Sequence, residues 1–124
     1  MLINEGYTPR QPVLTRMVEM LDLTYGDAMQ RSIEDRGHAA TYMFTVRQDC
    51  LRLIEDLDFA IKVNEKLIAD TQPAQMITQE MSDRLIAHAH EMIVLYKTDR
   101  DAAHAVISLI DTYAMALVGR PTYH

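Results

Sequence analysis

Residues 38–69, HAATYMFTVRQDCLRLIEDLDFAIKVNEKLIA, decide the fold class of this chain. Apolar side chains recur along this stretch at steps of three and four residues, which places them on one face of an α-helix. The repeat is a heptad seam with one polar member, and its positions are Met43, Val46, Cys50, Leu53, Leu57, Ala60, Asn64 and Leu67. A second stripe widens the apolar face and consists of Phe44, Leu51, Ile54, Ile61 and Ile68. A helix that is apolar on more than one side needs more than one neighbour.

A further helix is predicted before this stretch. Pro12 suits the first turn of a helix, and apolar residues follow it at helical spacing to about position 34. We therefore predict helices over about 12–34 and 38–69, separated by a stop at Asp35-Arg36-Gly37. Residues 1–10 precede the first helix and are expected to form an irregular, flexible arm.

Two helices are predicted after the break at 70–73. One runs over about 74–97. The other runs over about 99–118, with Thr98 as its N-cap and acidic residues in its first turn. Four helices with short connections pack most simply as an antiparallel bundle. The sequence therefore predicts one all-α domain over residues 1–124, folded as an antiparallel four-helix bundle.

Charge and cysteine content argue against several classes of function. The net charge of −6 is unfavourable for binding nucleic acid or an anionic membrane surface. Cys50 is the single cysteine, so neither an internal disulfide nor a cysteine-based zinc site is expected. The first six residues lack the charged and apolar regions of a signal peptide, and no apolar run approaches the ~18 residues that span a bilayer. We expect a cytoplasmic protein.

The sequence carries no motif that is typical of a catalytic or metal-binding site. We therefore expect no enzyme activity, no metal and no cofactor. The chain has no HExxH, no glycine-rich phosphate loop and no GxSxG. One alternative stays open. Arg84 is followed six positions later by His90, and this spacing resembles that of the HEPN ribonucleases. The alternative is therefore that the chain is an RNA-cleaving or toxin-type helical protein that uses Arg84 and His90.

The nine methionines permit two interpretations. Methionine fills irregular cores, and it also lines adaptable surfaces that accept amphipathic helices. Because the predicted helices carry more apolar face than a plain bundle buries, we favour a helix-binding surface. The candidate binding residues are Met17, Met20, Ile54, Ile61, Ile93 and Tyr96.

Three stretches resemble the FliS family of flagellin export chaperones. Leu14-Thr15-Arg16-Met17-Val18, continuing to Ile33-Glu34-Asp35, looks like the first long helix of that family. Leu57-Asp58-Phe59 resembles the end of its second long helix, and Lys97-Thr98-Asp99 resembles the turn before its last helix. The chain departs from the family at Glu19-Met20-Leu21, where a tyrosine, an acidic residue or asparagine, and a glycine are usual. It also lacks the tryptophan that is common near the end of the last helix.

The resemblance implies a function in secretion. Such chaperones bind the C-terminal helical segment of flagellin in a groove, and an N-terminal tyrosine can occupy part of that groove. Tyr7 is the residue that matches this role. We therefore expect a non-enzymatic protein that binds an amphipathic helix of a protein partner. In a more specific form of this hypothesis, the partner is flagellin. We expect the protein to bind neither nucleic acid nor membrane. The remaining alternative is a self-associating structural bundle, and monomer and homodimer both stay open.

Overall fold

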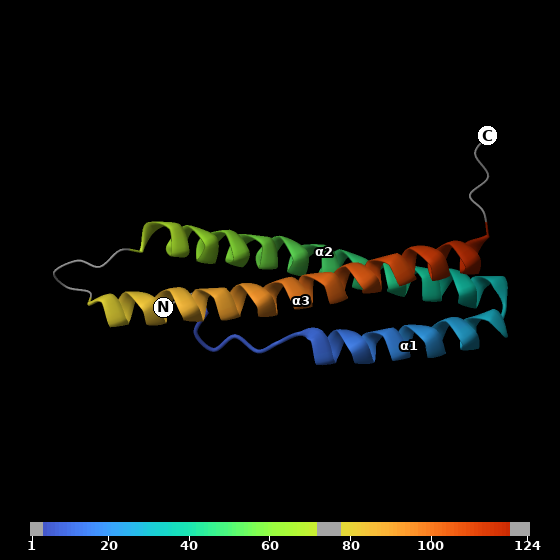
Figure 1. Cartoon of the computed structure of the whole chain (residues 1–124). Coiled ribbons are helices and arrows are strands. Elements are labelled where there is room, and N and C mark those ends of the chain that lie inside the picture. The colour runs from blue at the N-terminus through green and yellow to red at the C-terminus, as the bar shows by residue number, and fades with distance from the viewer. Residues whose placement is uncertain (1–3, 72–77, 120–124) are drawn as a thin grey trace, which may run out of the picture.

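The computed structural model describes residues 4–71 and 78–119, and in these residues it contains three α-helices and no strand. The helices are α1 (Gln11–Met29), α2 (Ile33–Asp70) and α3 (Gln79–Val118). α2 and α3 form a long antiparallel hairpin, and the shorter α1 lies along only one half of it (Figure 1). The all-α prediction is confirmed, whereas the prediction of four helices is wrong.

The predicted third and fourth helices are one continuous helix, α3. Thr98 is not an N-cap, because its hydroxyl donates to the carbonyl oxygen of Val94 at 2.9 Å, as threonines inside helices do. α3 is instead capped by Thr78, which accepts a hydrogen bond from the backbone N–H of Met81 at 3.2 Å. Residues 74–77, where the predicted third helix begins, lie outside the described residues.

The boundary between α1 and α2 lies earlier than predicted. Ser32 caps α2 by accepting a hydrogen bond from the backbone N–H of Asp35 at 3.2 Å, and Glu34 and Asp35 occupy the first turn. This cap, with acidic residues at the positive end of the helix, stabilises a start at Ile33. Gly37, which we predicted to be part of a stop, lies inside α2, since a single glycine costs a helix only about 1 kcal/mol.

The core has two parts that follow the two halves of the hairpin. Around α1, the buried residues include Leu14, Leu21, Met43, Val106 and Ile110. In the other half, a smaller cluster joins α2 to α3 and contains Leu57, Ala60, Ile61, Met92, Ile93 and Tyr96. Most of the predicted seam of α2 is buried, including its polar member Asn64, which has no exposed surface.

α3 is the one helix in the described part of the chain that is long and apolar enough to cross a membrane by length and composition. The core helix of a soluble protein passes the same test, because the test considers length and composition alone. Ala103, Val106, Ile110 and Ala114 of α3 are fully buried in the core beside α1 and α2.

Candidate functional site

The seam between α1 and α2 is open, because α1 packs mainly on α3 and touches α2 much less. A cavity of about 280 Å³ lies along this seam, and an adjoining cavity of about 310 Å³ continues it between α2, Tyr96 of α3 and the segment before α1. The two cavities share Arg10, Leu53 and Asp56. We call this surface the α1–α2 groove. Its residues are Tyr7, Arg10, Val13, Leu14, Met17, Asp49, Cys50, Arg52, Leu53, Asp56, Leu57, Phe59, Ala60 and Tyr96.

Apolar side chains at helical spacing form both walls of the groove. Val13 and Met17, one turn apart, contribute from α1. Leu53 and Leu57, also one turn apart, contribute from α2, and Phe59 lies at the edge with 63% of its surface exposed. The groove therefore offers an apolar floor between two rows of helical side chains.

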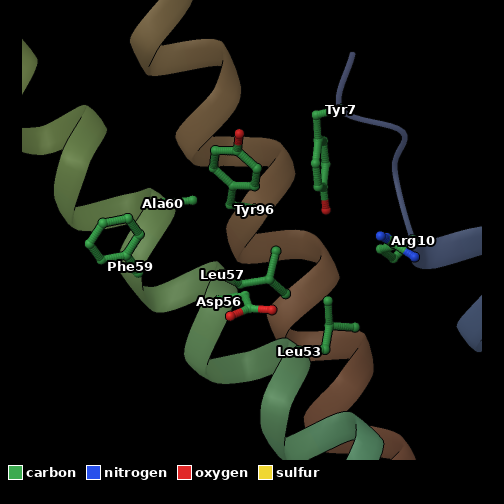
Figure 2. Close-up of a pocket in the computed structure, with 8 residues that line it drawn as sticks. All are labelled: Tyr7, Arg10, Leu53, Asp56, Leu57, Phe59, Ala60 and Tyr96. Carbon is green, nitrogen blue, oxygen red and sulfur yellow. The ribbon is translucent and has the colours of Figure 1, made fainter. Parts of the chain in front are cut away.

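Charged groups of both signs interrupt the apolar lining where the two cavities meet. Arg10 lies at the start of α1 and Asp56 on α2, and the two residues line both cavities. Figure 2 shows them in the cavity of about 310 Å³. Neither side chain forms an ion pair with any residue in the ranges 4–71 and 78–119. Farther along, Asp49 and Arg52 make a loose, exposed pair at 3.6 Å.

The segment before α1 is held against α2 and α3 by a polar network at Asn4. The amides of Asn4 and Asn64 donate to each other at 2.8 and 3.0 Å, and the Tyr96 hydroxyl donates to Asn4 Oδ1 at 2.7 Å. Asn64 also donates to the carbonyl oxygen of Ala60 at 2.7 Å. The buried amide of Asn64 thus has its partners, as a buried polar group requires.

Tyr7 and Asp99 form a second anchor at the end of the groove. The Tyr7 hydroxyl donates to Asp99, and its ring packs edge-on against Tyr96 with a centroid separation of 4.7 Å. Burial, and next the hydrogen bond to Asp99, raise the pKa of Tyr7 well above its usual range. The hydroxyl therefore stays protonated and acts as a donor.

Cys50 lies at the floor of the groove and is buried. Burial raises the pKa of its thiol, so the nucleophilic thiolate is disfavoured. Its role in the structure is that of a small apolar core residue, as its position in the seam predicted.

The structure separates the predicted binding residues into two groups. Tyr7, Met17 and Tyr96 line the groove, and Met20, seven positions after Val13, is exposed on the same face of α1. The three isoleucines are buried: Ile54 in the core around α1, and Ile61 and Ile93 in the cluster that joins α2 to α3. Ile93 also lines a cavity of about 350 Å³ between α2 and α3, apart from the groove. Arg10, Val13, Leu53, Asp56 and Phe59 also line the groove and were not among the predicted binding residues, although Leu53 was already a member of the predicted seam.

Arg84 and His90 are both exposed on α3. Arg84 pairs with Glu80 at 2.6 Å, one turn earlier on the same helix. Six residues of helix turn the chain by about 600°, so the two side chains leave the helix roughly 120° apart. Among the described residues, no three His, Cys, Asp or Glu side chains gather in a way that could hold a metal ion.

Comparison of this chain with protein-family models, with curated proteins and with solved structures finds no match.

Proposed function

We propose that the protein binds an amphipathic helix of another protein in the α1–α2 groove. The observation that carries this proposal is the open apolar seam between two helices of an otherwise packed bundle. Recognition of this kind places apolar residues at positions i, i+3, i+4 and i+7 of the bound helix into a groove. The two adjoining cavities give such a helix two places for large side chains.

The composition of the groove supports a helix as the ligand. The walls at Val13, Met17, Leu53 and Leu57 repeat with the period of a helix, so a helix lying along them meets side chains at regular intervals. Methionine and leucine adapt to ligands of different shape. The charged groups Arg10 and Asp56 at the middle of the groove would face polar side chains at the margin of the bound helix.

The resemblance to the FliS family gives this proposal a specific version, in which the bound helix belongs to the C-terminal segment of flagellin. The position of Tyr7 at the groove supports it. The chain also differs from that family, because Lys97-Thr98-Asp99, which resembles a turn there, lies inside the continuous helix α3.

A fluorescence titration tests the proposal. The chain contains no tryptophan, so a tryptophan at an apolar position of a helical peptide reports binding without background. Two peptides serve as probes: one from the C-terminal helical segment of flagellin, and one designed amphipathic helix of leucine and mixed charges. Val13→Glu and Phe59→Glu change exposed residues of the groove, and Val94→Glu changes an exposed apolar residue of α3 outside it.

The groove variants should weaken binding at least about tenfold, because each places a charge where the peptide is apolar. The Val94→Glu control should bind as the natural chain does. If neither probe nor intact flagellin binds, the helix-binding proposal is wrong. If only the designed peptide binds, the helix-binding function stands and the flagellin version is lost.

A further inference from the structure

An exposed apolar stripe runs along α1 beside the groove. It consists of Val13, Met20 and Leu23, whose exposed fractions are 55%, 58% and 69%. The spacings of seven and three residues place them on one side of the helix. Val13 belongs both to this stripe and to the wall of the groove, so the two apolar surfaces are continuous.

The charges on this face are balanced, although the whole chain is acidic. Arg16 lies on α1 between Val13 and Met20, and within the described residues it makes no ion pair. The face also holds Arg10 and Asp56, the Asp49–Arg52 pair and, on α1 or just after it, Glu19 and the Asp27–Arg31 pair, which with Arg16 makes four cations and four anions. The net charge of −6 therefore arises elsewhere on the chain, and two copies of this face can approach without like-charge repulsion.

We propose that, in the free protein, the groove is occupied by α1 of a second copy of this chain. This inference rests on the proposed function, since it takes the same groove to be a helix-binding site. A two-fold axis beside α1 would lay the stripe of each copy in the groove of the other, which is the self-complementary contact that a symmetric dimer requires. In this arrangement Arg16 of one copy would pair with Asp56 of the other, which has no ion-pair partner in the described part of the chain.

The balance of charges favours this occupant. The face supplies both an apolar ridge and an apolar groove, and it carries Arg10, Arg16 and Asp56, which form no ion pair with the residues that the structure describes. A second copy is therefore complementary in shape and in charge, and it is present at the concentration of the chain itself. An incoming helix has to displace α1 of the second copy, so dimerisation and binding of another protein exclude each other.

Sedimentation equilibrium of the full chain over a range of concentrations tests this inference. The expected mass is that of a dimer of the 14.2 kDa chain. Met20→Glu and Leu23→Glu should each raise the dissociation constant at least about tenfold, whereas Val94→Glu should leave it unchanged. Arg16→Glu should also weaken the dimer, and adding Asp56→Arg should restore it. Far-ultraviolet circular dichroism confirms that each variant is folded.

The tryptophan-labelled peptides complete the experiment, because they should convert the dimer to a complex of one chain with one peptide. A chain that stays monomeric overturns the inference, as does a dimer that is unaffected by changes at Met20, Leu23 and Arg16. Peptide binding to an intact dimer also overturns it, since the groove is then free. If the chain is a monomer that binds peptide, the dimer proposal is wrong and the proposed function stands. If the dimer is weakened by changes at Met20, Leu23 and Arg16 but neither peptide nor flagellin binds, the proposed function is wrong and the dimer proposal stands.

Discussion

Tyr7 donates its hydroxyl hydrogen bond to the carboxylate of Asp99, a residue 92 positions later on α3. The same carboxylate accepts hydrogen bonds from the backbone N–H groups of Arg10 and Gln11, each at 2.9 Å. These groups belong to the open end of α1, where a helix lacks partners of its own. Asp99 therefore caps α1 from a different helix and fixes both α1 and the preceding segment at the end of the groove.

The first prediction concerns this cap. Asp99→Asn keeps the size of the side chain but removes the charge that faces the positive end of α1. We expect a loss of about 1–2 kcal/mol in the free energy of unfolding, the usual range for a helix cap. Urea unfolding followed by circular dichroism measures it. Asp101→Asn, on the exposed side of the same helix, is the control and should change the stability little. Equal losses in both variants would contradict the capping role.

The second prediction concerns the pH dependence that Tyr7 causes. Its pKa is raised in the folded protein above the ordinary value of 10.0, chiefly by burial, so the folded state keeps the proton that the unfolded state releases first. The stabilisation is complete below pH 10 and is lost as the pH rises further, because the unfolded chain then binds fewer protons.

In Tyr7→Phe this contribution disappears, and with it part of the decline in stability above pH 10. At neutral pH the variant should lose about 1 kcal/mol, the net value of one hydrogen bond, while its ring still packs on Tyr96. Unfolding measured at several values of pH tests both statements. An identical alkaline decline in the natural chain and the variant would show that Tyr7 does not titrate as described.

The third prediction concerns Asn4, which bridges Asn64 and Tyr96. Asn4→Ala leaves the fully buried amide of Asn64 without two of its hydrogen bonds, which costs about 1–3 kcal/mol. It should also speed amide hydrogen exchange at Tyr7, whose N–H donates to the carbonyl oxygen of Asn4. Glu5→Ala changes an exposed neighbour and serves as the matched control. Unchanged stability and exchange in Asn4→Ala would mean that this network does not hold the segment.

The fourth prediction tests the continuity of α3. Thr98→Pro should cost about 3 kcal/mol or more, because proline inside a helix removes a hydrogen bond and clashes with the preceding turn. If a helix began at residue 99, proline at this position would be well tolerated. Gln79→Pro, at the first position of α3, should cost little and is the comparison. Thermal unfolding of both variants distinguishes a continuous helix from two.

Local signals predicted the helices well where periodicity was long and uninterrupted. Most of the seam of α2 from Met43 to Asn64 is buried, as its spacing indicated. Boundaries were less predictable, since they depend on which of several weak signals dominates. Thr98 and Asp99 have the chemistry of a cap, and Asp99 does cap a helix, but that helix is α1. No local pattern shows that the recipient of a cap lies almost ninety residues earlier in the chain.

The candidate site, too, was only partly predictable from the sequence. Periodicity alone established that the chain is helical and that its apolar surface exceeds what one helix face can bury. It could not tell that Ile54, Ile61 and Ile93 are covered while Val13, Met20 and Leu23 are exposed, because burial depends on which neighbour each face meets. That was decided by the tertiary packing of the short α1 on α3 rather than α2, which leaves the groove open. Spacing places a side chain on its own helix, and only the arrangement of the helices determines what lies opposite it.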